Sequence, residues 1–234
     1  MRNLTITLIL EILFVSNILA QALPIAIDGC FNDWSTSSAN YQDKHNDGAD
    51  IDLLSFSVSN DSSYLFIKFE MANELLLNSN NELFLEIDTD NDSTTGININ
   101  EIGADLEWSF GGKFGKLYSP DGIDTVRQIN ICFMALPTVT SNIYELAIKK
   151  NIKPDGKNPL FKNDNIKICF VDKKLNGDFM PDMGAKFSYS FDNSLVPLYK
   201  VVELEKQNEQ FVRVMTYNTL WGICVNLRLN LNKC

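Results

Sequence analysis

The sequence has very little histidine: His45 is the only one in 234 residues. This nearly excludes histidine-rich metal centres, and any catalytic apparatus with a histidine base would depend on that one residue. Basic residues are also scarce, since 20 lysines and arginines face 30 aspartates and glutamates, for a net charge of −10. Such a chain is not built to bind nucleic acid, whereas its acidic residues suit hard cations such as Ca²⁺.

Cysteine is too sparse and too scattered for a disulfide framework. The count of five is odd, and the residues lie far apart. Cys132 and Cys169 fall within apolar, strand-like runs, where a free thiol behaves as a small hydrophobic group. We expect both to be buried and unpaired, although the sequence leaves open whether Cys30 pairs with either of them.

Long apolar runs are absent apart from the first residues. Leu4 to Leu19 is largely apolar, follows Arg2 and leads into Ala20-Gln21-Ala22, the small-x-small pattern that signal peptidase accepts. The short run and Glu11 within it argue against a membrane-spanning helix. We therefore expect residues 1–22 to be a signal peptide and the mature protein to be secreted, outside the cell or in the periplasm, without a membrane anchor.

The remaining chain has the two-residue period of β-strands. Short segments rich in β-branched and aromatic residues are separated by Asn, Asp, Gly and Pro clusters: DLLSFSVSN, SYLFIKFEM, ELFLEID, ADLEWSF, NIYELAIKK, NIKICFVD and KFSYSF. Only ANELLL near Leu75 looks helical. The pattern predicts an all-β fold, a two-sheet antiparallel β-sandwich over residues 23–192, followed by a linker over 193–210.

The segment from Ala104 to Phe110 shows the alternation most clearly. One face carries Ala104, Leu106, Trp108 and Phe110, and the other carries Asp105, Glu107 and Ser109. This predicts a half-buried antiparallel strand with Trp108 in the core. The two acids of the polar face are close enough for glycosidase chemistry, but no supporting constellation accompanies them, so we expect no catalytic residues here.

An acidic loop, DTDNDSTTG, directly follows the predicted strand ELFLEID. Alternate carboxylates on a tight loop can converge on Ca²⁺, which prefers six to eight oxygen ligands. The predicted ligands are Asp88, Asp90 and Asp92, with further oxygens from Asp50 and Asp52, from Asp47, or from Asp105. The loop is not an EF-hand, because Ser93 and Ile99 replace the required Gly and Glu. The alternative is an Asx-type turn that binds no metal.

Several motifs, in this order, resemble the β-sandwich modules related to family 9 carbohydrate-binding modules. They are IAIDGCFNDW, NDSSYLFIKFEM, LFLEIDTDNDSTTG, IGADLEW and NGDFMPDMGAKFSYSF, and they cover about residues 25–191. Asp28, Gly29, Asp33 and Trp34 match the opening motif, and Gly103, Ala104 and Asp105 match the GAD segment. The resemblance implies a jelly-roll-like sandwich, structural Ca²⁺ near the acidic loop and the binding of sugar chain ends.

Sugar binding needs exposed aromatic faces beside polar groups. Tyr41 and Tyr118 lie in polar stretches and are the predicted ligand-binding residues. Trp34 follows an N-terminal turn, and we expect it to be a plug that closes the sandwich instead.

Residues 211–234 begin with FVRVMTYNTLWG. This resembles the first strand of the endonuclease/exonuclease/phosphatase superfamily, in which the Asn of the motif, here Asn218, lies in the active site. The acidic metal ligand and the histidine base of that family have no counterpart after Asn218. We expect a truncated domain start with an unrelated tail; the alternative is an edge strand added to the sandwich.

Three functions remain open from the sequence. The first is a secreted, non-catalytic accessory module, stabilised by calcium and binding carbohydrate. The second is a fragment of a secreted metal-dependent phosphodiesterase or nuclease, inactive as this chain. The third is an adhesion or assembly domain that uses the sandwich surface for protein contacts.

Overall fold

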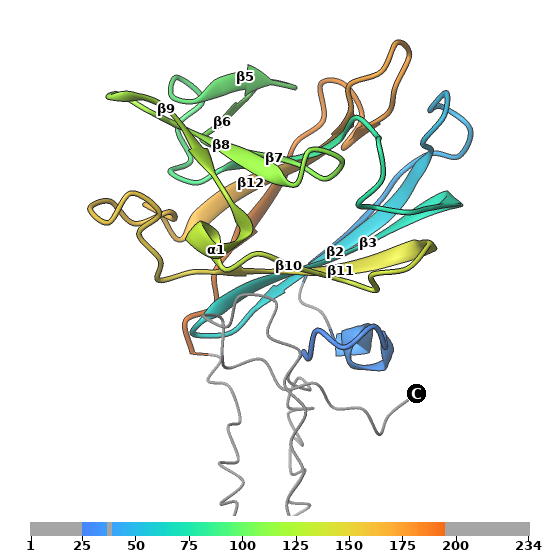
Figure 1. Cartoon of the computed structure of the whole chain (residues 1–234), viewed down its shortest axis with the longest axis horizontal. Coiled ribbons are helices and arrows are strands. Elements are labelled where there is room, and N and C mark those ends of the chain that lie inside the picture. The colour runs from blue at the N-terminus through green and yellow to red at the C-terminus, as the bar shows by residue number, and fades with distance from the viewer. Residues whose placement is uncertain (1–24, 37–38, 195–234) are drawn as a thin grey trace, which may run out of the picture.

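The structure, a computed structural model, describes residues 25–36 and 39–194 (Figure 1). The predicted signal peptide, nearly all of the predicted linker and the 211–234 segment with Asn218 lie outside these ranges. Within them, no helix has the length and apolarity that a bilayer-spanning segment needs.

The fold is all-β, with two packed antiparallel sheets, as the sequence predicts. The five-stranded sheet has the order β1 (Ala39–Gln42), β2 (Leu53–Asn60), β3 (Tyr64–Leu75), β11 (Ser141–Lys149) and β10 (Met134–Leu136). The seven-stranded sheet has the order β13 (Phe179–Met180), β12 (Asn165–Asp172), β4 (Leu83–Asp88), β7 (Leu106–Ser109), β8 (Phe114–Ser119) and β9 (Gly122–Val126), and β14 (Phe187–Ser190) also pairs with β12.

Three small elements complete the sandwich. The hairpin of β5 (Ile97–Ile99) and β6 (Ile102–Ala104) covers the outer side of the seven-stranded sheet, and the 3-10 helix η1 (Asn32–Thr36) lies on the outer side of the five-stranded sheet (Figure 1). The helix α1 (Gln128–Ile131) follows β9. The helix predicted near Leu75 is wrong, because β3 continues to Leu75 and its last residues pair with β11.

Aromatic side chains join the two sheets. The Phe170 ring on β12 lies 4.7 Å from Phe69 on β3 and 5.7 Å from Phe56 on β2, measured between ring centroids. Trp108 is 1% exposed and stacks on Phe133 at 4.3 Å, which confirms its predicted place in the core. Burying such rings is the main stabilising contribution available to a sandwich of this size.

The polar face of the predicted 104–110 strand differs from expectation. The predicted strand is interrupted at Asp105, which lies between β6 and β7, and β7 is buried on both faces. Glu107 is only 4% exposed because lysines from β8 and from the end of β12 lie over it. The strand is therefore not half-buried.

The prediction that two cysteines are buried and unpaired is confirmed. Cys132 and Cys169 are both buried and free, which excludes a disulfide from Cys30 to either one. Burial raises the pKa of the Cys169 thiol to about 12, so this side chain acts as a small apolar group of the hairpin contact.

The N-terminal segment is fastened by one buried acid. Glu145 on β11 is fully buried, and its carboxylate accepts hydrogen bonds from the backbone N–H groups of Asp28 (2.6 Å) and Gly29 (2.5 Å). The Trp34 indole N–H donates to the second oxygen of the same carboxylate at 3.0 Å. Trp34 packs on Tyr64 and Phe66, so it closes the outer side of the five-stranded sheet.

We predict that Glu145→Ala destabilises the fold by about 2–4 kcal/mol, because it leaves two part-buried backbone N–H groups and the buried Trp34 indole N–H without an acceptor. Urea unfolding of the full chain measures this. Glu74→Ala, at an exposed position of β3, is the control and should change the free energy of unfolding by less than about 0.5 kcal/mol. An equal loss in both variants would contradict the role of Glu145.

Candidate metal centres and binding surfaces

Five aspartates gather where the loops around β1, β2 and β13 meet. We call them the Asp47 cluster: Asp43, Asp47, Asp52, Asp178 and Asp182. Carboxylate oxygens of Asp43, Asp47 and Asp182 lie within 4.8 Å of one another, and so do those of Asp47, Asp52 and Asp178. Because Asp47 belongs to both triads, the cluster is one continuous group of oxygen atoms.

Local backbone geometry holds this cluster together. A Cβ on Gly48 would lie 2.0 Å from the Ile51 carbonyl oxygen, so only glycine lets the loop fold this tightly. The Asp52 carboxylate accepts the backbone N–H of Asn46 at 2.9 Å. Asp178 accepts the N–H of Leu53 at 2.7 Å, which ties the loop before β13 to the start of β2.

Asp43 has no comparable support. Both of its carboxylate oxygens are buried, and neither accepts a hydrogen bond of normal geometry. Burial, followed by the nearby charge of Asp178, raises the pKa of Asp43 to about 7. Among the ion pairs of the described residues, only Lys44 with Asp182 at 2.6 Å touches the cluster, and the Lys44 side chain is 72% exposed. The cluster therefore carries an excess of negative charge that a cation would offset.

A second group, the Asp88 cluster, consists of Asp88, Asp90 and Asp105. These three predicted ligands do converge, with carboxylate oxygens within 4.8 Å of one another. Asp88 ends β4, and Asp105 lies between β6 and β7. Thr89 donates both its backbone N–H and its hydroxyl to Asp105, each at 2.9 Å.

Lysines already neutralise much of the Asp88 cluster. The Lys167 ammonium lies 2.6 Å from Asp88 Oδ2, and the Lys162 ammonium lies 3.3 Å from Asp90 Oδ2. Lys162 is also 3.6 Å from Asp105. Asp88 Oδ1 is buried without a hydrogen bond, so this one oxygen remains as a ligand for a cation. A cation here would compete with Lys162, whereas the centre of the Asp47 cluster has no such competitor among the described residues.

Two predicted ligands lie outside both clusters. Asp92 accepts the backbone N–H of Thr94 at 2.9 Å and its hydroxyl at 2.7 Å, and these bonds lower the pKa of Asp92. This is the Asx-type turn that the sequence allowed as the alternative. Asp50 forms an exposed ion pair with Lys174 at 2.9 Å, while its neighbour Asp52 does join the Asp47 cluster.

Sequence reasoning missed three members of the Asp47 cluster as ligands: Asp43, Asp178 and Asp182. Asp178 and Asp182 stand in the segment NGDFMPD, whose two acids were the available signal. Assigning them to the loop over residues 43–52 requires the strand pairing of β13 with β12, which periodicity alone does not reveal.

The two predicted sugar-binding tyrosines are half-buried. The Tyr41 ring lies 5.6 Å from Phe56 and 6.4 Å from Phe187, so it packs against the core, and burial raises its pKa. Tyr118 on β8 also has a pKa raised by burial, and next by the charge of Glu107. Neither tyrosine lines the two cavities described below.

The outer face of the seven-stranded sheet carries a pair of opposed glutamates. Glu86 on β4 lies directly opposite Glu107 on β7. Lys173 lies 2.7 Å from Glu86 and also bonds to Glu107, which pairs with Lys116 at 2.9 Å. Burial raises the pKa of Glu86 to about 7, whereas the two lysines outweigh burial at Glu107 and lower its pKa. Glu86 is fully buried, so this pair is a structural charge network.

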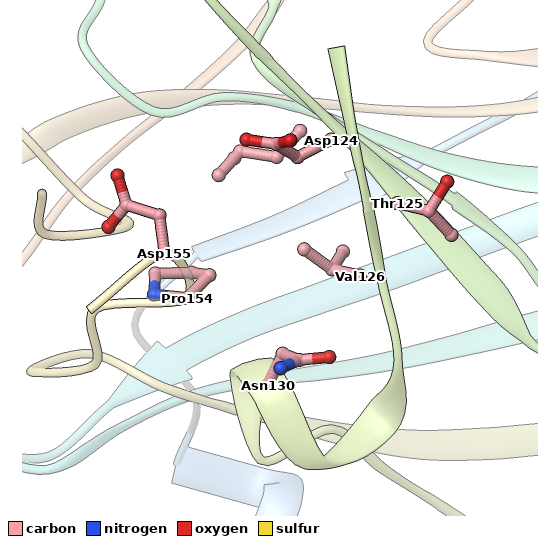
Figure 2. A pocket seen from close by; sticks show the side chains of 7 residues that line it. Asp124, Thr125, Val126, Asn130, Pro154 and Asp155 are labelled. Carbon is pink, nitrogen blue, oxygen red and sulfur yellow. The ribbon is translucent and has the colours of Figure 1, made fainter. Parts of the chain in front are cut away.

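A cavity of about 350 Å³ lies between β8, β9, α1 and the loop around residue 154. Figure 2 shows Asp124 and Asp155 at the top and side of the opening, Asn130 on α1 below them, and Thr125 on the other side of β9. Backbone N–H groups of Lys157 and Asn158 hold the pKa of Asp155 down to about 2. The carboxylates of Asp124 and Asp155 make this cavity unsuitable for anions.

A second cavity, of about 420 Å³, lies beyond the end of β11. Its lining combines two lysines, three asparagines and two phenylalanines with one serine and one aspartate.

No family model matches the sequence, and no curated protein or solved structure matches it either. Both family resemblances therefore stay predictions.

We predict that the charge network makes stability fall as the pH rises from about 4.5 to 7. The pKa of Glu86 is about 7 in the folded state, above its value of 4.5 in the unfolded chain, so the folded state binds this proton more tightly. The protonated carboxyl therefore adds to the free energy of unfolding in full below pH 4.5, and this contribution is lost as the pH rises through about 7. This shift in the pKa of Glu86 lowers the free energy of unfolding by about 3 kcal/mol at most between these two pH values.

Unfolding free energies measured across this pH range should show a flatter profile for Glu86→Gln. Glu82→Gln, at an exposed position before the same strand, should keep the wild-type profile. A wild-type slope retained in Glu86→Gln would contradict the assignment.

Proposed function

We propose that this protein is a secreted, non-catalytic binding module whose β-sandwich is stabilised by Ca²⁺ and whose ligand is carbohydrate. The observation that carries the calcium part is Asp43, a carboxylate with both oxygens buried, no hydrogen bond of normal geometry and acidic neighbours. A buried carboxylate without a donor is strongly unfavourable unless a positive charge accompanies it.

The donor set of the Asp47 cluster fits calcium. All five side chains offer oxygen, and Ca²⁺ takes six to eight oxygens from carboxylates that bind through one or both atoms. Histidine and cysteine are absent from the cluster, which disfavours zinc and other softer metals. Asp47 would hold the ion together with Asp43 and Asp182, or together with Asp52 and Asp178, and the ion would neutralise charge where three loops meet.

The same arrangement explains how calcium would stabilise the sandwich. Asp43 and Asp52 belong to loops of the five-stranded sheet, whereas Asp178 and Asp182 flank β13 of the seven-stranded sheet. An ion bound to both sets would join the two sheets at one edge. The Asp88 cluster is the second candidate position, because Asp88 Oδ1 is buried and unpaired.

The carbohydrate part rests on the family resemblance together with the cavity beyond β11. Amide side chains can exchange hydrogen bonds with sugar hydroxyls, and aromatic rings can pack on the C–H faces of a sugar. That cavity has both kinds of group in its lining.

We predict that Ca²⁺ raises the melting temperature of the protein. For an ion that binds only the folded state, a concentration of 100 times Kd adds about 2.7 kcal/mol to the free energy of unfolding. Asp43→Asn should abolish most of this gain, yet leave the chelated protein as stable as wild type or slightly more stable, because it removes a repulsive buried charge. Thermal unfolding with calcium and with chelator measures both effects.

Matched variants locate the ion. Asp50→Asn removes an exposed charge from the same loop and should keep the full calcium gain. Asp90→Ala reports on the Asp88 cluster and should lower the gain only if calcium also binds there. An unchanged melting temperature in wild type at millimolar Ca²⁺ would contradict the calcium proposal.

A glycan array probed with the full chain tests the carbohydrate proposal. We expect reproducible binding that weakens in chelator, because loss of the ion destabilises the sandwich that carries the cavity. A blank array would count against carbohydrate and favour a protein partner.

A further inference from the structure

A buried cation lines the cavity beyond β11. Lys150 is 7% exposed, and its ammonium donates to the Asp61 carbonyl oxygen and to Asn193 Oδ1, both at 3.1 Å. It also lies 4.2 Å from the centroid of the Phe191 ring. Every one of these contacts is to a neutral group.

No carboxylate forms an ion pair with this lysine within the described ranges. Asp164, Asp61 and Asp192 raise the pKa of Lys150 only from a distance, and burial outweighs them and lowers it. A buried ammonium group held by neutral oxygens keeps much of its desolvation penalty. An anion placed in the cavity would form the missing ion pair.

Hydrogen bonds between the two sheets fix the surroundings of the cavity. Asn60, only 3% exposed, donates to the carbonyl oxygens of Asp61 and Asp192 and accepts the Tyr189 hydroxyl at 2.7 Å. Phe161 packs edge-on against Phe191 with the ring centroids 5.2 Å apart. A cavity held in this way loses little conformational entropy when a ligand binds.

The remaining lining indicates what kind of anion would fit. Asn151 and Asn163 provide amides, and Phe161 provides an aromatic surface of its own, since the Phe191 ring is occupied by Lys150. Lys162 adds a second cation, although it also contacts the Asp88 cluster. Asp164 is the one acid of the lining, and Asn193 donates to it at 3.1 Å. Amides and an aromatic ring beside a buried ammonium match a sugar ring that bears a carboxylate.

We propose that this cavity binds an acidic sugar, a uronic acid residue, with Lys150 as the counter-ion of its carboxylate. The inference rests on the proposed carbohydrate binding and adds the class of sugar and the position of the site. Lys162, whose side chain is 36% exposed, is the more accessible of the two lining lysines, and Lys150 is the buried one that the carboxylate would contact.

Isothermal titration of the full chain with methyl glucuronide and methyl glucoside tests the proposal, because the two probes differ only in the carboxylate. We expect the glucuronide to bind at least tenfold more tightly. Lys150→Met removes the charge while keeping the length of the side chain, and should reduce glucuronide affinity at least tenfold. Lys157→Met, at an exposed position outside the cavity, should have no effect.

The melting temperature of Lys150→Met shows whether it folds, and Lys162→Met, at the rim, gives a second measurement that should weaken glucuronide binding several-fold. Equal affinity for both probes would overturn the proposal while leaving carbohydrate binding intact. Acetate or sulfate competing as strongly as the glucuronide would also overturn it, since the sugar ring would then contribute nothing. If neither probe binds but neutral glycans bind on the array, only this inference fails.

Discussion

The fold depends on how each buried carboxylate is neutralised. In this chain with ten more acids than bases, nine acidic side chains are buried within the described residues: Asp33, Asp52, Glu86, Asp88, Asp105, Glu107, Glu145, Asp172 and Asp178. Backbone N–H groups serve Glu145 and Asp178, and lysines serve Glu86, Asp88 and Glu107. The strands and loops that supply these donors are thereby held in register.

Each means of neutralisation has a different consequence for the protein. A backbone N–H donor does not titrate and belongs to the fold itself, as in the hydrogen bonds of the N-terminal segment to Glu145. A lysine pair such as Lys167 with Asp88 depends on a side chain that crosses from the neighbouring strand. Asp43 has neither, and Lys150 presents the opposite case, a buried cation without an acid. These two residues mark the places where an external ion or ligand has most to add.

The sequence predicted the fold class well because strand periodicity is a local property. Trp108 alternates with polar neighbours, and its burial followed directly from that spacing. The acidic loop was also visible, and Asp88, Asp90 and Asp105 do meet. The lysines that reach these acids could not be predicted, since Lys167 approaches through the pairing of β12 with β4 and Lys162 lies in the loop before β12. Asp178 is likewise 126 residues after Asp52, and only sheet topology brings the two together.

The two tryptophans of the described residues, Trp34 and Trp108, lie in different surroundings. Trp34 lies on the outer side of the five-stranded sheet with its indole N–H on a carboxylate, whereas Trp108 lies between the sheets against Phe133. The polar contact of Trp34 and the hydrocarbon surroundings of Trp108 give the two indoles different emission energies. The indole of Trp34 therefore reports on the attachment of the N-terminal segment, and the indole of Trp108 on the packing between the two sheets.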